Sequence, residues 1–155
     1  MREILFRGKS VDDNEWVYGS FCRDAVEQRL GIGTGADGFI RFYDTETKKM
    51  KMVEAQRETV GQYTELNDNN KAKIFEGDIV RCYHRFLDDE FIAVVEFGNP
   101  NSAYNWGFQL RLITKTNFRT DILLWVEMEE TGAFIEIIGN IHDNPELMEV
   151  IGEEK

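Results

Sequence analysis

The chain contains few of the residues that build reactive or metal-binding sites, with two cysteines and two histidines in 155 residues. Both cysteines lie in apolar or aromatic stretches, Ser20–Cys22 and Val80–Tyr83. In such surroundings a thiol usually serves as a small buried hydrophobe. We therefore expect two structural thiols, no disulfide and a reducing compartment.

The sequence also lacks a run of about 18 apolar residues, the length that a membrane-spanning helix requires. Its apolar start, Ile4–Phe6, is too short for the hydrophobic region of a signal peptide. We therefore expect a cytoplasmic protein with no membrane partner. With 42% hydrophobic residues the chain can bury a core, either as one domain or as two small ones.

Basic residues are scarce near the C-terminus. From Thr120 to Lys155 there are ten acidic residues and one basic residue, which gives −9 of the total charge of −11. A polyanion is repelled by such a segment, so nucleic acid is an unfavourable partner. The simplest interpretation is a solvated acidic face that keeps the protein soluble. The alternative is an acidic decoy that occupies a host DNA-binding protein.

Short alternations of apolar and polar residues, separated by turn residues, predict a mainly β fold built from hairpins. The expected strand segments are 4–6, 16–22, 39–43, 50–53, 76–83, 91–97, 107–112, 122–126 and 134–141. A short helix is expected over 24–30. A second helix is expected after Asn144, because Asn is a good N-cap and Pro145 suits the first helical position.

One pair of residues has the chemistry of a zinc site. Cys82 and His84 are two apart on a predicted strand and so share a face, and Cys22 or His142 would have to complete the site. The sequence contains no CxxC and no HxxxH, which makes a core thiol beside a loop histidine the better interpretation.

Two further patterns resemble sites only superficially. Asp88-Asp89-Glu90 lies at an expected hairpin tip, where consecutive side chains diverge, so a solvated turn is favoured over a cation site. Gly33–Gly38 matches Gly-x-Gly-x-x-Gly but does not open a helix in a βαβ unit, so we expect a loop and no phosphate site. We predict no catalytic, cofactor-binding or metal-binding residues, and a protein that is not an enzyme.

Aromatic residues are the remaining candidates for a binding surface. Nine of them could stack bases or fill cores and subunit contacts: Trp16, Tyr18, Phe39, Phe42, Tyr43, Tyr104, Trp106, Phe108 and Trp125. The nearby basic cluster consists of Arg41, Lys48, Lys49 and Lys51, interleaved with Asp44 and Glu46. Core filling or subunit contact is favoured, and a small nucleic-acid-binding barrel is the alternative.

Three segments carry a resemblance to a known family. They read ILFRGK…WVYG over residues 4–19, TVGQYTELNDNN…IFEGDIV over 59–80, and IIGNIHDNPEL over 137–147. In combination they resemble the YopX family of bacteriophage and prophage proteins. One departure is visible: the family often has Gly after the Asn of the central turn, where this chain has Asn69-Asn70. Because Asn also tolerates positive φ, we expect the turn to survive.

The resemblance implies a mainly β protein of small barrel-like parts, with an SH3-like C-terminal part and no assigned activity. On this basis we divide the chain into an N-terminal β subdomain, 1–58, and a C-terminal subdomain, 59–155. The function we expect is that of a non-enzymatic phage or prophage accessory protein. It would act in the bacterial cytoplasm through protein–protein contacts, as a homo-oligomer and with a possible host partner.

Overall fold

The computed structural model describes residues 3–22, 38–86, 88–98, 107–113, 119–126 and 132–148. The chain separates into two compact units, Met1–Tyr63 and Thr64–Lys155. The expected division lies after residue 58, and the boundary between the compact units lies within the strand β5, Gly61–Asn67.

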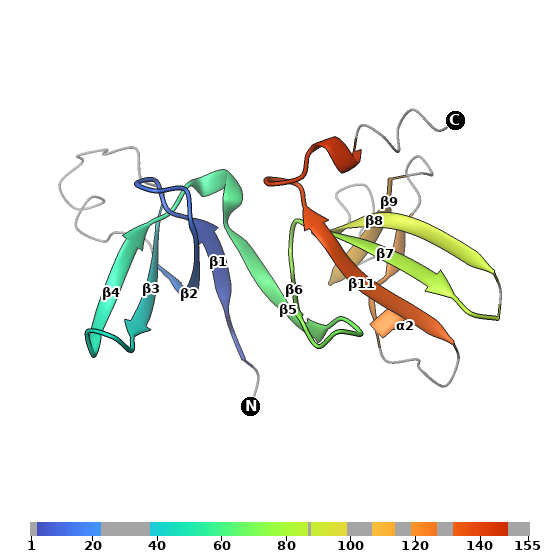
Figure 1. The fold of residues 1–155 in the computed structure, drawn as a ribbon, viewed down its shortest axis with the longest axis horizontal. Helices are drawn as coiled ribbons and strands as arrows, with labels where there is room; N and C mark the ends of the chain where they lie inside the picture. Colours follow the sequence, from blue (N-terminus) through green and yellow to red (C-terminus); the bar gives the residue numbers. More distant parts are fainter. Residues whose placement is uncertain are drawn as a thin grey trace. The chain divides into compact units, whose positions relative to one another are not determined.

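The first unit contains four strands ahead of β5: β1 (Phe6–Lys9), β2 (Trp16–Cys22), β3 (Phe39–Asp44) and β4 (Lys49–Glu54). A 3-10 turn, η1 (Arg57–Thr59), precedes β5. The strands form an antiparallel sheet in the order β4-β3-β2-β1-β5, and the far end of β5 pairs with β6 (Lys73–Phe75) (Figure 1). Both hairpins expected in this unit, β1–β2 and β3–β4, are therefore confirmed.

The first sheet buries one face around Ile40, which is fully buried on β3. Gly19 on β2 permits this packing, since a Cβ there would lie 2.1 Å from the carbonyl oxygen of Arg41. The turn η1 is fastened to β1 by Thr59, whose Oγ1 accepts a hydrogen bond from Lys9 N at 2.8 Å. Strand alternation then leaves the opposite face of β2, β3 and β4 open to solvent.

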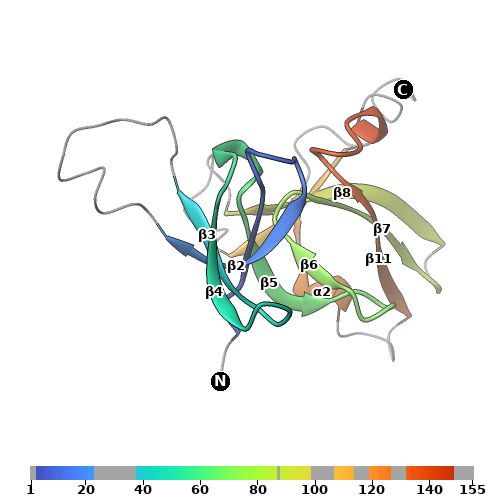
Figure 2. The same cartoon turned by 60° about the vertical axis from the view of Figure 1, so that its left-hand side comes forward.

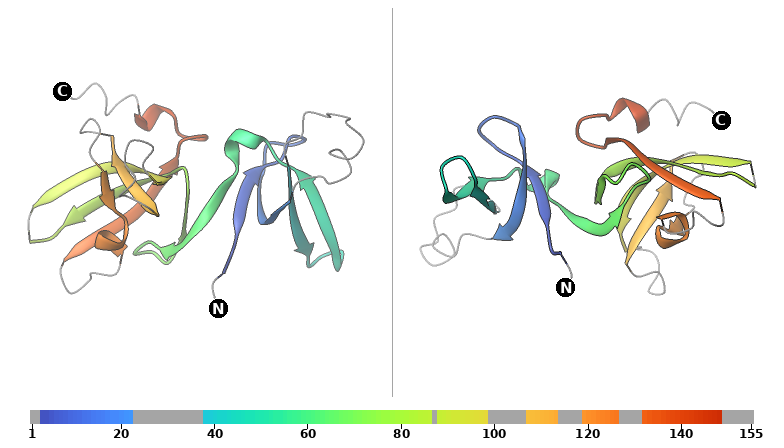
Figure 3. Two further views of the ribbon diagram at one scale, coloured as in Figure 1. Left: turned by 180° about the vertical axis from the view of Figure 1, so that it is seen from behind. Right: turned by 60° about the horizontal axis from the view of Figure 1, so that its bottom comes forward.

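The second unit is built on a five-stranded antiparallel sheet in the order β10-β9-β8-β7-β11 (Figures 1 and 3). Its strands are β7 (Asp78–His84), β8 (Asp89–Phe97), β9 (Phe108–Leu112), β10 (Arg119–Asp121) and β11 (Ala133–Asn140). The expected third hairpin is the β7–β8 pair. The core of this unit contains Ile74, Val80, Cys82, Phe91, Ala93, Val95, Leu110, Leu112, Ile122 and Ile135.

The prediction of a mainly β fold built from hairpins is confirmed, with two antiparallel sheets. Within the described ranges neither sheet closes into a barrel, so the SH3-like form of the C-terminal part stays a prediction. No helix in the part of the chain that the structure describes is long and apolar enough to cross a membrane.

One expected strand is wrong. Residues 122–126 were expected to be extended, but Leu123–Val126 form the short helix α2. A short apolar run does not distinguish helix from strand by periodicity. Asp121 decides the outcome locally, because its Oδ1 accepts a hydrogen bond from Leu123 N at 3.0 Å and so starts a helical turn.

The two expected helices are only partly visible. The segment 24–30 lies outside the described residues. Helical structure after Asn144 is present at residues 146–148, which is where the described chain ends. The side-chain oxygen of Asn144 does not cap the helix, because Oδ1 accepts a hydrogen bond from Asn140 N at 3.2 Å. The carbonyl oxygen of Asn144 accepts a hydrogen bond from Leu147 N.

The buried core of the second unit gives a stability prediction. Leu110 is fully buried, so Leu110→Ala is expected to lower the free energy of unfolding by about 2–5 kcal/mol through lost burial and a residual cavity. Leu124→Ala is the control, because that side chain is 52% exposed and its loss should change the value by less than about 0.5 kcal/mol. Urea unfolding followed by circular dichroism measures both. Equal effects of the two substitutions on the free energy of unfolding would contradict the assignment of Leu110 to the core.

Candidate functional site

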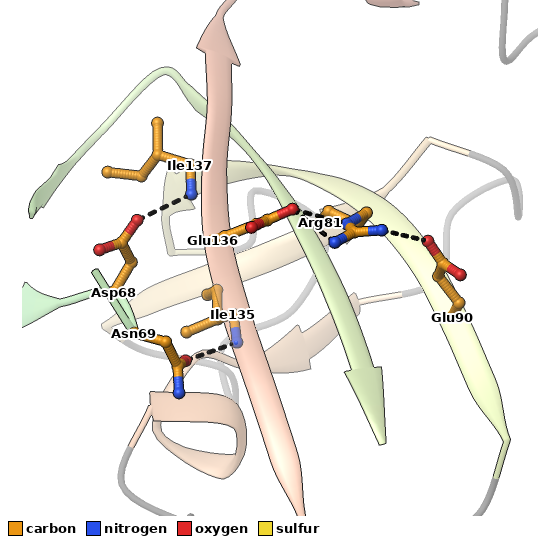
Figure 4. A network of polar contacts seen from close by, with 7 residues as sticks. All are labelled: Asp68, Asn69, Arg81, Glu90, Ile135, Glu136 and Ile137. Carbon is orange, nitrogen blue, oxygen red and sulfur yellow. Dashed lines mark hydrogen bonds and ion pairs between the residues drawn. The ribbon is translucent and has the colours of Figure 1, made fainter. Parts of the chain in front are cut away.

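The Asn-rich turn between β5 and β6 is hydrogen-bonded to the outer side of β11 (Figure 4). Asn69 N donates to the carbonyl oxygen of Ile135 at 3.0 Å, and Asn69 Oδ1 accepts from Ile135 N at 2.8 Å. Asp68 Oδ2 accepts from Ile137 N at 3.0 Å. Because β11 is the end strand of its sheet, the turn satisfies backbone groups that a neighbouring strand would otherwise have to satisfy.

The carboxylate of Asp68 organises this turn. Its side chain is buried, and its Oδ1 accepts from both Asn70 N and Ala72 N at 2.9 Å. Together with the bond from Ile137, three backbone N–H groups compensate the burial of the acid. The turn that was expected to survive is present at residues 69–70, and the residue of positive φ beside it is Lys71 (φ 66°).

The Glu76-Gly77-Asp78 segment makes the turn into β7. Gly77 has a φ of +86°, a conformation that favours glycine. Its N–H donates to the carbonyl oxygen of Val95, and its own carbonyl oxygen accepts from Ile141 N, each at 2.9 Å. Asp78 is buried, and its Oδ2 accepts from Phe75 N at 2.8 Å. The segment therefore joins β6, β7 and the residues that follow β11.

The second signature segment, at the end of β11, forms a compact polar turn. Asn140 Oδ1 accepts from His142 N at 3.0 Å and from Asp143 N at 2.9 Å. Gly139 leaves room for Asn144 beside it, since a Cβ there would lie 2.5 Å from Asn144 Oδ1 and the Asn144 side chain would have to shift. The polar side chains of both signature segments thus bind backbone groups, which gives them a structural role.

A charged row crosses the same sheet. Arg81 on β7 lies between Glu136 on β11 and Glu90 on β8, with Nη–Oε1 distances of 2.6 and 3.3 Å (Figure 4). The attraction of Glu136, followed by that of Glu90, raises the pKa of Arg81 above its usual range. These side chains are partly exposed, so the row supports the register of β7 and its neighbours without adding much stability.

The structure gives Cys82 and His84 different surroundings. Cys82 is fully buried, and burial raises the pKa of its thiol far above the usual range, so it is a core residue as expected. His84 packs edge-on against Trp125 at 6.5 Å, and its Nδ1 accepts from Phe86 N at 3.3 Å. Cys22 lies in the first unit, beside Met52. Among the described residues no group of three or more His, Cys, Asp or Glu side chains is placed to hold a metal ion.

The structure describes the acidic cluster Asp88-Asp89-Glu90 and one residue of the glycine-rich stretch Gly33–Gly38. Asp89 and Glu90 begin β8, where Glu90 pairs with Arg81, and Asp88 has a positive φ of 49° at the hairpin turn. These acids therefore sit in a turn and an ion pair. Of the glycine-rich stretch, residues 33–37 lie outside the described residues, and only Gly38 is described.

The basic cluster is divided between the two faces of the β3–β4 hairpin. In the observed register Arg41 pairs with Met52, whereas Lys51 pairs with Phe42 and Lys49 with Asp44, so alternation puts Arg41 opposite in face to the two lysines. Lys51 also forms an ion pair with Asp44, and its hydrogen bond lowers the pKa of that acid to about 2. A single basic surface built from these residues is not formed.

The open face of the first sheet is the feature that remains. We call it the β2–β4 face; by strand alternation it comprises Tyr18, Ser20, Arg41, Tyr43, Met50 and Met52. Figure 2 labels the three strands that form it. The side chains of Tyr18, Tyr43, Met50 and Met52 are between 46% and 56% exposed. Tyr43 and Met50 are directly paired, and Met52 lies two residues along β4 on the same side, so three of these exposed side chains are neighbours. Neighbouring exposed apolar side chains are less common on a surface than isolated ones.

Other predicted aromatics have structural places. Trp125 packs edge-on against Phe91 at 4.8 Å, Phe108 against Phe97 at 5.1 Å, and Trp16 lies under the guanidinium of Arg7 at 4.6 Å. Tyr104 and Trp106 lie outside the described residues. Sequence reasoning missed the contact of Asp68 and Asn69 with β11, because those residues are more than 60 positions apart.

The Asp68 contact predicts an unusual response to a nearly isosteric change. Asp68→Asn replaces one acceptor oxygen by an NH₂ group, so a donor would face either Ile137 N–H or the turn, at a cost of about 1–3 kcal/mol in stability. Asn69→Asp keeps an acceptor for Ile135 N and is the matched control. Amide hydrogen exchange at Ile135 and Ile137 should accelerate in the first variant. Unchanged exchange at Ile137 would contradict the assigned contact.

The two thiols should differ in reactivity. Iodoacetamide at mildly alkaline pH is expected to modify Cys22, which is partly exposed, and to leave Cys82 unmodified in the folded protein. In denaturant both should react. Mass spectrometry of the digested protein measures this, and labelling of Cys82 under native conditions would show that the core is more open than described.

Comparison with known proteins gives a match to a family model and similarities to solved structures. A family model described as YopX protein matches residues 5–149. Among solved structures, the chain is similar to the crystal structure of protein EF1440 from Enterococcus faecalis. The two share 16% identity over 94% of this chain and 98% of the other, with a TM-score of 0.46. That score supports no conclusion about function.

No curated protein matches the chain. The family match covers both signature segments, including the turn at Asp68 and Asn69 and the polar turn that follows β11. The resemblance inferred from three sequence segments is thereby confirmed over nearly the whole chain. This protein belongs to the YopX family.

Proposed function

We propose that the protein is a non-enzymatic accessory protein that acts through protein–protein contacts and self-associates through the β2–β4 face. The observation that carries the proposal is the exposure of Tyr18, Tyr43, Met50 and Met52, each about half exposed on adjacent strands. Tyrosine and methionine are both enriched at protein interfaces. Methionine also adapts its shape to a partner surface.

The occupant we propose for this face is a second copy of the chain. A two-fold contact requires a surface that complements itself. The β2–β4 face has one cation, Arg41, and its strand β4 ends with an acid on the same face, Glu54. Arg41 makes no ion pair among the residues that the structure describes. Two copies face to face can therefore pair Arg41 of one with Glu54 of the other.

Charge supports protein rather than nucleic acid as the partner. Residues 1–63 contain ten basic and eleven acidic residues, for a charge of −1, while residues 64–155 contain eight and eighteen, for −10. Neither unit has the basic excess that phosphate binding requires. Within this proposal the protein is phage- or prophage-encoded and works in the bacterial cytoplasm, and its C-terminal part is SH3-like.

Self-association can be tested by sedimentation equilibrium over a range of micromolar concentrations. We expect a mass above that of the monomer, and a shift toward the monomer in Tyr43→Glu, which places a charge in the centre of the face. Leu124→Glu is the matched control, because Leu124 is similarly exposed but lies on α2 in the other unit. A strict monomer throughout, or equal effects of the two substitutions, would contradict the proposal.

A further inference from the structure

The strand β4 forms the free end of the first sheet, with β3 as its one neighbour in the sheet order (Figures 1 and 2). Such an edge has unpaired backbone groups and can accept a further strand. Its sequence, Lys49-Met50-Lys51-Met52-Val53-Glu54, alternates cationic and apolar residues over most of its length. The edge is therefore a separate feature from the β2–β4 face, although it shares Met50 and Met52 with it.

The β3–β4 register shows which backbone groups point outward. Ala55 N donates to the carbonyl oxygen of Gly38 at 3.1 Å, so the bonded pairs of this ladder include residue 55 and alternate from there. Lys51 and Val53 then bond to β3, and Met50 and Met52 direct their N–H and C=O away from it. Glu54 confirms this direction, because its carbonyl oxygen accepts from Val11 N at 3.0 Å on the outer side.

The chain already uses part of this edge. Ser10 forms an antiparallel bridge with Ala55, and Val11 bonds to Glu54, so a short extended segment of the chain occupies one end of the outer side. No hydrogen bond within the described residues reaches the outward groups of Met50 and Met52. One end of the outer edge of β4 is thus paired with the chain itself, and the backbone groups of Met50 and Met52 are oriented to pair with a further strand.

The lysines oppose a second copy at this edge. In antiparallel self-pairing about a two-fold axis, residues on the same face stand opposite each other. Lys51 would then face Lys51 of the other copy, or lie one pair away from it, with Lys49 close by. Like charges directly opposite in a sheet are destabilising, and lysine is a common device against edge pairing.

The same lysines favour an acidic strand. Lys49 makes no ion pair among the residues that the structure describes, and Lys51 shares its charge with Asp44 alone. A partner strand would place its residues on that side opposite the two lysines, and its alternate residues beside Met50 and Met52, which are 52% and 55% exposed. Acidic residues suit the positions opposite Lys49 and Lys51, and apolar residues suit the positions beside Met50 and Met52.

We propose that the outer edge of β4 binds an extended segment of a partner protein, alternating acidic and apolar residues, by strand addition. Backbone bonds to Met50 and Met52 give the affinity, and Lys49 and Lys51 select the acidic pattern. The inference rests on the proposed function in one respect: the protein acts by protein contact. It does not depend on self-association through the β2–β4 face.

The test uses the full chain and two synthetic peptides in fluorescence anisotropy titrations. One peptide alternates Val and Glu, and the other alternates Val and Lys. We expect the acidic peptide to bind about tenfold or more tightly than the basic one, with an affinity that falls as salt rises. In Lys49→Glu/Lys51→Glu the preference should reverse toward the basic peptide.

Two substitutions at one position separate backbone pairing from side-chain contact. Met52→Pro removes an outward N–H that β3 does not use, and proline is tolerated on edge strands in that orientation. It should reduce binding of the acidic peptide about tenfold or more, while circular dichroism reports an intact fold. Met52→Leu retains the N–H and an apolar side chain, and it should bind like the parent protein.

Equal binding of both peptides, no binding of either, or undiminished binding by correctly folded Met52→Pro would each overturn the inference. If Met52→Pro instead lowers the mass of the oligomer, the edge joins two copies, and the acidic-strand assignment is wrong. Failure of self-association is detected separately, by the Tyr43→Glu comparison. A monomer that binds the acidic peptide would retain this inference and refute the self-association.

Discussion

The bond between Asp68 and the backbone of β11 is the interaction on which the second unit depends. The Asp68 carboxylate is buried and accepts hydrogen bonds from backbone N–H groups of its own turn and from that of Ile137. A buried carboxylate is costly unless such donors surround it, so the turn and the strand need each other. The same contact covers β11, the end strand of its sheet, where unpaired backbone groups would otherwise invite another chain.

Several features follow from that fixed strand. Ile135, bonded to Asn69 on its backbone, contributes a fully buried side chain to the core, together with Cys82 and Val80 from β7. The bulge between Ile137 and Gly139 then lets the chain turn at Asn140, whose side chain binds the following backbone. In this chain the polar side chains of the segments 59–80 and 137–147 therefore include several that bind backbone groups.

The two units differ in how far the end strands of their sheets are covered by other parts of the chain. In the second unit β11 is covered by a turn of the same chain, whereas β4 in the first unit has outward groups at Met50 and Met52 with no bond among the described residues. The first unit also exposes Tyr43 on its sheet face. These two open surfaces support the proposed binding role, and both lie in the unit of residues 1–63, whose net charge is −1.

Local pattern was sufficient for some elements and misleading for others. Alternation and turn residues predicted the hairpins, because those depend on neighbours in sequence. The run Ile122–Val126 was assigned wrongly, since a short apolar segment fits either helix or strand and the Asp121 side chain decided between them. The basic residues near Arg41 read as one cluster in sequence, but strand alternation separates them onto two faces.

Residue type and short-range spacing were enough to predict the mainly β class, the hairpins and the buried character of Cys82. The family came from the resemblance of three segments, over residues 4–19, 59–80 and 137–147. The folded structure was needed to see that Asp68 and Asn69 cover the edge of β11, that Arg41 and Lys51 lie on opposite faces, and that β4 is an end strand. Those facts require pairing between distant segments and a register, and strand order cannot be read from the spacing of residues along the chain.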